Sequence, residues 1–442
     1  MEFYQNVVVG FGKGGKTLAK RLSQKGQKVL VIEQSDKMYG GTCINVGCLP
    51  SKALILRSEA QRNFSESVIE KNQTISLLRN KNYHMLADDN NITVVRGQAK
   101  FIANHQLEIT TSTGIVNVEG EKIFINTGAT GIVPSILGLK QSKYILDSTL
   151  AMELSKIPKK LLILGAGYIG LEFASMFTNY GSEVQVLDLG SELISREDRD
   201  IANLIQSDLQ DKGIKFNLGL EIQEVKDIDN QVRVIAKKGD KQVVYDADYL
   251  LIATGRRPNT DNLGLENTDI QVGTKGEIIV DEYLRTSVEN VWALGDVKGG
   301  LQFTYISLDD QRIIYDYLFG DKQRTVNNRG NIPYTVFLTP PLSNVGENET
   351  ALQRRNKEYK VFKKFLSEVP RAQIENKTEG LFKLLVDQKT KKVLGASLYG
   401  IQSPEIINFV SLIMNLELEY TKLRDGIYTH PTMLEIFNDL LS

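Results

Sequence analysis

The chain has 442 residues, which is enough for about three domains of roughly 150 residues each. It carries 53 basic and 54 acidic residues, so its net charge is −1, and 41% of its residues are hydrophobic. This balance supplies no field for holding a nucleic acid or an anionic membrane. The composition also excludes a disordered chain and a disulfide-rich secreted scaffold.

The first residues, MEFYQNVVVGFG, predict a strand that begins by Asn6. They contain no basic run followed by a long apolar stretch, as a targeting signal would. No apolar run approaches the roughly 20 residues of a membrane-spanning helix. We therefore expect a cytoplasmic protein with no membrane and no nucleic-acid partner.

The first predicted unit joins a strand at residues 7–9 to a glycine motif, a helical stretch and a second strand, Val29–Ile32, that ends in Glu33. In such a unit the glycines make a tight turn and let the backbone approach a pyrophosphate, and the helix N-terminus attracts the phosphates. The terminal acid binds ribose hydroxyls. The sequence therefore predicts a dinucleotide site. The motif GFGKGG has its glycines at Gly10, Gly12 and Gly15.

The segment from Gly40 to Lys52 reads GGTCINVGCLPSK and holds the only two cysteines, Cys43 and Cys48. They lie at the predicted start of a helix, where N–H groups and the helix dipole stabilise a thiolate. Two thiols beside a flavin take up two electrons and pass them on by thiol–disulfide exchange. Half of a zinc site is disfavoured because zinc takes four ligands, and a structural disulfide is disfavoured in a reducing compartment.

Helices, ribbons and a closing strand complete the first half of the chain. Residues Ser51–Asn63 and Ser65–Leu86 carry apolar side chains at helical spacing, and residues 92–118 alternate as β-ribbons. The strand Ile123–Gly128 closes in Thr127 and Gly128, at the sheet edge where ligands bind.

The same pattern then returns. A strand at Leu161–Leu164 precedes the motif GAGYIG, and a second strand, Val184–Leu187, ends in Asp188. The acid follows the first glycine by 23 residues in both copies, and a strand closing at Gly255 matches the earlier one. Because both copies meet the structural context of the motif, two unrelated glycine turns are disfavoured. Two dinucleotides, and hydride transfer between them, are expected. The glycines of the second motif are Gly165, Gly167 and Gly170.

The C-terminal part predicts further ribbons at residues 214–245 and, from Ile332, an α+β domain. Its predicted helices are Pro404–Asn415 and Thr432–Leu440. Near the end, YTHPTMLE places His430 before a proline and Glu435 in the first helical turns. A carboxylate there can hold one imidazole nitrogen protonated and leave the other free to exchange protons. The alternative is that His430 is only a turn or cap residue.

With these motifs assembled, the chain resembles the pyridine nucleotide–disulfide oxidoreductases over its whole length. The cysteine segment, the order of the two glycine motifs and the HPTxxE pattern carry the resemblance, and Asp296 in TSVENVWALGD matches the acid that binds the flavin ribityl chain. The resemblance implies an α/β fold with two tandem Rossmann-like domains and a C-terminal α+β domain that forms a homodimer. The implied limits are 1–148 with 277–328 for FAD, 149–276 for NAD(P)H and 329–442 for dimerisation.

The resemblance also implies roles for single residues. Cys48 would face the flavin, Cys43 would meet the substrate, and Lys52 would pair with Glu172 beside the flavin N5 region. His430, oriented by Glu435, would be the general acid–base in the partner subunit's active site, and Tyr168 would gate the nicotinamide pocket. The implied cofactor-binding residues are Gly10, Gly12, Gly15, Glu33, Gly41, Thr42, Lys52, Ala99, Thr127, Gly128, Asp296, Gly165, Gly167, Tyr168, Ile169, Gly170, Asp188 and Gly255.

Within this family the chain most resembles the bacterial hypothiocyanous acid reductases of reactive-chlorine resistance. Three segments carry that likeness: GLQFTYISLDD, SREDRD and YTHPTM with NDLL. Mercuric reductases have a second cysteine pair, and this chain has none. The resemblance implies a small oxidant, hypothiocyanous acid (HOSCN), as substrate and no resident metal. The alternatives are a lipoamide dehydrogenase or another small disulfide reductase, a copper(II) reductase, and a redox-sensing flavoprotein without turnover. Asp188 predicts NADH over NADPH, unless Arg196 or Arg199 approaches the 2′-phosphate.

Overall fold

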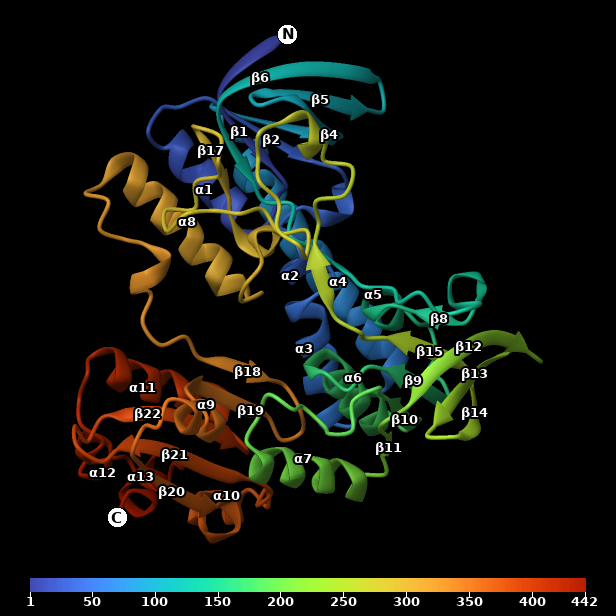
Figure 1. The fold of residues 1–442 in the computed structure, drawn as a ribbon, viewed down its shortest axis with the longest axis vertical. Helices are drawn as coiled ribbons and strands as arrows, with labels where there is room; N and C mark the ends of the chain where they lie inside the picture. Colours follow the sequence, from blue (N-terminus) through green and yellow to red (C-terminus); the bar gives the residue numbers. More distant parts are fainter.

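The computed structural model describes residues 1–442. Two parallel-sheet units and a C-terminal α+β domain make up the chain, and the two termini lie at opposite ends of the molecule (Figure 1). These layers confirm the predicted α/β fold class. No helix is long and apolar enough to cross a membrane.

The first unit is a seven-stranded sheet in the order β3-β2-β1-β6-β5-β4, with β17 also paired to β6. Strands β1, β2, β3, β6 and β17 are parallel. Their apolar runs are buried because helices cover one face of the sheet, and the antiparallel pair β4–β5 with loop residues between 263 and 288 covers the other. Helices α1 (Lys13–Ser23) and α8 (Thr304–Phe319) pack against each other beside it. The strands are β1 Glu2–Val9, β2 Val29–Glu33, β3 Ile92–Arg96, β4 Gln98–Ala103, β5 Gln106–Thr111, β6 Gly114–Ile125 and β17 Val291–Ala293.

The second unit is a parallel five-stranded sheet in the order β11-β10-β9-β15-β8. An antiparallel ribbon of β12, β13 and β14 adjoins it, and the short pair β7–β16 joins it to the first unit. The strands are β8 Ile145–Leu146, β9 Lys160–Leu164, β10 Glu183–Leu187, β11 Lys215–Asn217, β15 Tyr249–Ile252, β12 Glu221–Ile228, β13 Gln231–Lys238, β14 Lys241–Ala247, β7 Ala129–Gly131 and β16 Arg256–Pro258. Its helices are α5 Ser148–Ala151, α6 Tyr168–Asn179 and α7 Arg199–Asp211.

The C-terminal domain is an antiparallel sheet in the order β18-β19-β22-β21-β20, covered by helices (Figure 1). Its own hydrophobic core unites β21 and β22 with α11 and α13. The strands are β18 Tyr334–Val336, β19 Leu342–Gly346, β20 Tyr359–Phe365, β21 Leu381–Asp387 and β22 Val393–Tyr399. The helices are α9 Glu349–Arg354, α10 Pro370–Ile374, α11 Ser403–Asn415, α12 Thr421–Arg424 and α13 Ile436–Leu440.

Helix α3 (Cys48–Glu59) occupies the centre of the molecule (Figure 1). One core cluster joins Leu54 of α3 and Phe64 of α4 (Phe64–Ala87) to Phe173 and Phe177 of α6 and to Leu342 of β19. The helix that begins at Cys48 is therefore fixed by packing against the second unit and the C-terminal domain together.

Two sequence expectations were wrong in detail. Strands β3 and β11 fall inside the segments predicted as ribbons, but each pairs in parallel with its neighbour in a main sheet. A two-residue periodicity reveals a half-buried strand but not the direction of its partner. Strand β8 belongs to the second sheet, and β17, later in the chain, belongs to the first sheet again. The first unit is therefore made of two separate stretches of the chain. The exact domain limits stay a prediction.

Candidate active site

The two cysteines lie on consecutive helical turns. Cys43 is in α2 (Thr42–Asn45), and Cys48 is the first residue of α3, which has Gly47 as its N-cap and no capping side chain. Both are thiols in this structure; Cys43 is half-buried and Cys48 is exposed. The uncapped N-terminus points N–H groups and a partial positive charge toward Cys48, as the sequence predicted.

The two thiols differ in acidity. A hydrogen bond with Cys43 lowers the pKa of Cys48 to about 6; loss of hydration opposes this, while the Thr304 hydroxyl and Lys52 support it. The Thr304 Oγ1 lies 3.7 Å from the Cys48 Sγ. The same bond with Cys48, followed by burial, raises the pKa of Cys43. At neutral pH the reduced pair therefore carries its negative charge on Cys48.

One turn further along α3, Lys52 forms an ion pair with Glu172 of α6. The Lys52 Nζ lies 2.7 Å from the Glu172 Oε2, and Glu172 also accepts a hydrogen bond of 2.9 Å from the Phe337 amide. Glu172 is buried. The structure thus brings together the two residues that the sequence expected to pair; their role beside a flavin stays a prediction.

The first glycine motif forms the turn that a dinucleotide requires. Gly10 has φ +102°, and a Cβ there would overlap the Asn126 carbonyl oxygen, so only glycine fits. Gly12 caps α1 without any capping side chain. The Phe11 amide donates to the Glu33 carboxylate at 3.0 Å, which fixes the acid at the end of β2. The residues present fit an adenine dinucleotide such as FAD.

Asn126 is a site residue that the sequence analysis missed. Its Oδ1 accepts the Gly15 amide at 2.9 Å, and its Nδ2 donates to the Leu294 carbonyl at 2.8 Å. The Gly14 amide donates to Ser307 at 3.1 Å. A buried asparagine at the end of the apolar run IFINTG was the available signal, because buried polar side chains need partners.

The other predicted FAD residues lie around the same edge. Gly41 packs so closely on Gly12 that a Cβ on it would lie 2.7 Å from the Gly12 Cα. Thr42 is the first residue of α2, and Thr127 with Gly128 follows β6. Ala99 is buried within β4, 7% exposed. Asp296 lies in a 3-10 helix (Gly295–Lys298), and its carboxylate accepts no hydrogen bond from the chain. Burial raises its pKa, as suits an acid awaiting a hydroxyl partner.

The second glycine motif repeats this construction. Gly165 has φ +112°, Gly167 caps α6 without a capping side chain, and a Cβ on Gly170 would overlap the Gly165 carbonyl oxygen. Asp188 accepts the amides of Ala166 and Gly190, each at 2.6 Å. Ile169 follows in the first turn of α6, and Gly255, with φ +109°, follows β15.

Tyr168 is held by a buried carboxylate that the sequence analysis missed. Its hydroxyl donates to Glu197, and the Tyr334 hydroxyl of β18 donates to the same oxygen at 2.9 Å. Glu197 is 4% exposed, and burial raises its pKa, opposed by the two phenols. Phe303 stacks on the Tyr334 ring at 6.0 Å between centroids, next to Thr304. This aromatic row links the second glycine motif to Cys48.

His430 and Glu435 meet as predicted, but away from the cysteines. The His430 Nδ1 lies 2.8 Å from the Glu435 Oε1, and His430 is 73% exposed. The Thr432 amide donates to the other Glu435 oxygen at 2.7 Å, so Glu435 also caps the turn. Hydrogen bonds from His430 and Thr432 lower the pKa of Glu435. The segment before α13 lies at the far end of the C-terminal domain from α3 (Figure 1).

Comparison with known families places the chain. The family "Pyridine nucleotide-disulphide oxidoreductase" matches residues 4–310, and its dimerisation domain matches residues 332–441. The chain belongs to the pyridine nucleotide-disulphide oxidoreductases. It is therefore an NAD(P)H-dependent flavoprotein that acts on sulfur groups, and its third domain is the dimerisation domain of that family.

Three relatives illustrate the likeness. The chain is 47% identical to the probable pyridine nucleotide-disulfide oxidoreductase RclA of Escherichia coli K12, over 100% of this chain and 99% of that one. It is 31% identical to the mitochondrial dihydrolipoyl dehydrogenase of Pisum sativum, over 98% and 90%. A Cu(II) complex of the HOCl-induced flavoprotein disulfide reductase RclA from Escherichia coli matches its fold with a TM-score of 0.96, covering 100% and 99%.

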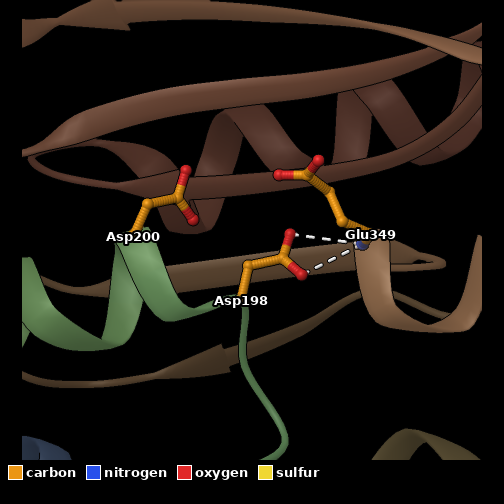
Figure 2. A group of neighbouring side chains, drawn as sticks. All are labelled: Asp198, Asp200 and Glu349. Carbon is orange, nitrogen blue, oxygen red and sulfur yellow. Dashed lines mark hydrogen bonds between the residues drawn. The ribbon is translucent and has the colours of Figure 1, made fainter. Parts of the chain in front are cut away.

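This pyridine nucleotide-disulphide oxidoreductase also contains a cluster of acids between its second and third domains. Asp198, Asp200 and Glu349 bring their carboxylates together, and the Glu349 amide donates to Asp198 at 3.0 Å (Figure 2). The buried Lys383 Nζ lies 2.8 Å from Asp198 and 3.0 Å from Asp200 and also contacts Glu349. An ammonium fills the place that a metal ion would take, so the cluster fastens β21 to α7.

Proposed function

We propose that this chain reduces hypothiocyanous acid with NADH, through FAD and the Cys43–Cys48 pair, in the cytoplasm. One observation carries the proposal: the chain has a single dithiol, with an acidic Cys48 at a helix N-terminus beside a half-buried Cys43. A tiny electrophilic oxidant needs neither a second cysteine pair nor a peptide-sized groove. The likeness to RclA, an HOCl-induced protein in Escherichia coli, supports an oxidant of this class.

The proposed chemistry is thiol exchange. The Cys43 thiolate attacks the sulfur of HOSCN and the S–O bond breaks; one proton is taken up, water leaves and Cys43–S–SCN remains. The Cys48 thiolate then attacks the Cys43 sulfur, thiocyanate leaves and a disulfide forms. When bound, FAD relays two electrons from NADH to that disulfide. The sum is NADH + HOSCN → NAD⁺ + SCN⁻ + H₂O.

The surroundings of Asp188 support NADH as the reductant. Both Asp188 oxygens accept backbone amides, which fixes its negative charge where it can bond ribose hydroxyls and repel a 2′-phosphate. Arg199 donates to the Ile194 carbonyl at 2.9 Å and lies 3.3 Å from Glu192, so its guanidinium is turned into its own loop. We propose that Tyr168 gates this site, as the family likeness implies.

The exposed position of His430 supports action across a homodimer. Within one chain the segment before α13, which carries His430 and Glu435, lies at the far end of the C-terminal domain from α3 (Figure 1). The His430 side chain is 73% exposed, so it is open to a second copy. We propose that His430 of a second copy exchanges protons with Cys43 and departing water. We also propose the limits 1–148 with 277–328, 149–276 and 329–442 for the FAD, NAD(P)H and dimerisation domains.

The decisive experiment is HOSCN-dependent oxidation of NADH by the holoenzyme and by Cys43→Ser. We expect the variant to lose at least about 1,000-fold in rate, because Cys48 alone cannot form the disulfide that accepts electrons from the flavin. Oxidised glutathione and dihydrolipoamide, assayed in parallel, should be poor substrates. Activity that survives the substitution, or a preference for oxidised glutathione or for dihydrolipoamide with NAD⁺ over HOSCN, would contradict the proposal.

The reduced enzyme should also show a pH-dependent long-wavelength band from the Cys48 thiolate beside FAD. Because hydrogen bonding lowers the Cys48 pKa to about 6, the band is expected above about pH 6 and should fade as pH falls through that value. An anaerobic titration with NADH at several pH values measures it. A midpoint near the ordinary thiol pKa would show that Cys43 does not stabilise this thiolate.

Copper(II) reduction is a second candidate, favoured by the Cu(II) complex of the relative RclA. The same dithiol or the flavin would supply one electron to each ion. NADH oxidation with copper(II) as sole acceptor, followed by a copper(I)-specific dye, tests it. If wild type and Cys43→Ser reduce copper(II) equally while only wild type reduces HOSCN, copper reduction is a side reaction at the flavin.

A further inference from the structure

A buried lysine, Lys16, lies on the Cys43 side of the dithiol without an acidic partner. Lys16, in the first turns of α1, is 4% exposed, so the protein's own atoms enclose it. Its ammonium donates to the Asn82 Oδ1 of α4, and no carboxylate lies within ion-pair distance. A buried ammonium with one neutral acceptor is costly, and such groups are kept where their charge is used.

The packing brings this charge to Cys43. A Cβ on Gly40 would lie 3.4 Å from the Asn82 side chain, and Gly41 contacts Gly12, so α1, α4 and the loop into α2 converge. Burial lowers the pKa of Lys16 to about 8, Lys13 acts in the same direction, and the Cys43 thiolate opposes them. In return the Lys16 ammonium lowers the pKa of Cys43 against the larger effect of Cys48.

The two lysines near the dithiol are therefore different. Lys52, on the Cys48 side, is neutralised by Glu172 at 2.7 Å. Lys16 has no carboxylate partner, and with its pKa lowered by burial to about 8 it is mostly protonated at pH 7. In the reduced pair the negative charge lies on Cys48, so a proton must pass from Cys43 to Cys48 before Cys43 can attack. A cation near Cys43 favours this transfer because it stabilises the Cys43 thiolate.

We propose that Lys16, held by Asn82, is a positioning residue that stabilises the Cys43 thiolate when it attacks the oxidant. The inference rests on the proposed function only in taking Cys43 as the substrate-facing thiol. The same charge favours departure of an anion, such as thiocyanate, from the Cys43 sulfur. The other groups facing Cys43 are Cys48 on α3 and the Thr304 hydroxyl on α8, joined in the proposed dimer by His430 of a second copy.

The test is alkylation of Cys43 in the reduced holoenzyme. Iodoacetamide is applied between pH 5 and pH 10, and peptide mass spectrometry follows Cys43 and Cys48 separately. We expect Lys16→Met to slow Cys43 alkylation about tenfold at pH 7 and to move its pH profile upward, with Lys16→Arg restoring most of the rate. Reduction of the flavin by NADH should not change. Lys20→Met is the matched control, because Lys20 lies one turn on in α1 and pairs with Asp89 at 2.8 Å.

Three results would overturn the inference. The first is a Lys16→Met variant with full FAD content whose Cys43 alkylation follows the wild-type pH profile. The second is loss of FAD in Lys16→Met and Lys16→Arg but not in Lys20→Met, which would assign Lys16 to the cofactor. Should Lys16→Met fail to fold, Asn82→Leu removes the acceptor and keeps the charge, and an unchanged profile there is the third. Alkylation needs no HOSCN, so a wild type inactive toward HOSCN contradicts the proposed function and leaves the Lys16 result intact.

Discussion

The two dinucleotide units are built on one plan and differ at a single kind of contact. In both, an acid at the end of the second strand accepts the amide that follows the first glycine: Glu33 accepts Phe11 at 3.0 Å, and Asp188 accepts Ala166 at 2.6 Å. In both, the first glycine faces a carbonyl at the end of another strand, from Asn126 or from Ala253.

The difference lies in the side chains of those two facing residues. Asn126 ties the Gly15 amide to the Leu294 carbonyl, and Ser307 accepts the Gly14 amide, so two side chains, one after β6 and one from α8, lock the first turn. Ala253 has only a methyl group, 3.5 Å from a Cβ placed on Gly170. The locked turn suits a cofactor that stays bound, and the unlocked turn suits one that exchanges in every cycle.

The largest effect is expected when the first glycine of each dinucleotide unit is changed to alanine. Gly10→Ala forces a Cβ into the Asn126 carbonyl at positive φ, and Gly165→Ala does the same at Ala253. We expect Gly10→Ala to lose FAD, and Gly165→Ala to keep FAD but lose at least about 100-fold in flavin reduction by NADH, or about 2.7 kcal/mol. The FAD absorbance per protein and anaerobic NADH titration measure both.

Gly26→Ala is the control for that pair. Gly26 also has positive φ, +76°, but nothing lies within 4 Å of its Cβ position. It should cost only the backbone strain, about 1 kcal/mol of unfolding free energy, with normal FAD content. Normal NADH reduction in Gly165→Ala would show that the second motif does not hold the nicotinamide dinucleotide.

A smaller effect is expected from Asn126→Ala. The change leaves the Gly15 amide and the Leu294 carbonyl without partners, at about 1–3 kcal/mol each, and should weaken FAD retention tenfold or more. Dialysis against increasing concentrations of chaotropic salt, read by flavin fluorescence, measures retention. Asn6→Ala is the matched control, since Asn6 is buried in β1 and donates to the Lys28 carbonyl at 3.2 Å. Equal FAD loss in both variants would reduce Asn126 to a general stability residue.

The sequence predicts best those features that depend on residues close together in the chain. The glycine motifs, the terminal acids Glu33 and Asp188 and the start of α3 at Cys48 are set by short-range geometry, and the structure contains each of them. The Lys52–Glu172 pair spans 120 residues and was reached only through the family likeness.

The features missed are long-range contacts without a spacing rule. Asn126 reaches Gly15 across 111 residues, and Tyr334 reaches Glu197 across 137. Lys16 looks like an ordinary helix lysine until α4 covers it. Periodicity identifies the buried face of each segment, but it does not say which distant side chain arrives there.

Asp188→Asn tests the second dinucleotide unit and its proposed choice of NADH. An asparagine keeps one accepting oxygen, enough for only one of the two backbone amides at Ala166 and Gly190, and removes the charge that repels a 2′-phosphate. We expect kcat/KM for NADH to fall and the preference for NADH over NADPH to shrink about tenfold, or about 1.4 kcal/mol. Steady-state kinetics with both cofactors measure the ratio. A wild type that prefers NADPH would refute this role of Asp188.

The smallest expected effect concerns the proposed gate of the exchanging site. Glu197 accepts both Tyr168 and Tyr334 with one carboxylate oxygen, so Glu197→Gln weakens two hydrogen bonds to a charged acceptor. A less firmly held Tyr168 swings aside more readily, and we expect KM for NADH to fall about threefold with little change in FAD content. The reaction of pre-reduced enzyme with oxidant should be unaffected, because it does not pass the gate.

Two further variants show whether Glu197→Gln acts on the Tyr168 gate or on the stability of the protein. Tyr334→Phe removes one of the two donors and should move KM in the same direction by a smaller factor. Tyr359→Phe removes a phenol that donates to Glu349 at 3.1 Å and bonds to none of the residues around Tyr168, so it should leave KM unchanged. If Glu197→Gln lowers the melting temperature without moving KM, the carboxylate only fastens β18 to the second unit. A change of KM without a change in melting temperature ties Glu197 to the exchange of the nicotinamide cofactor.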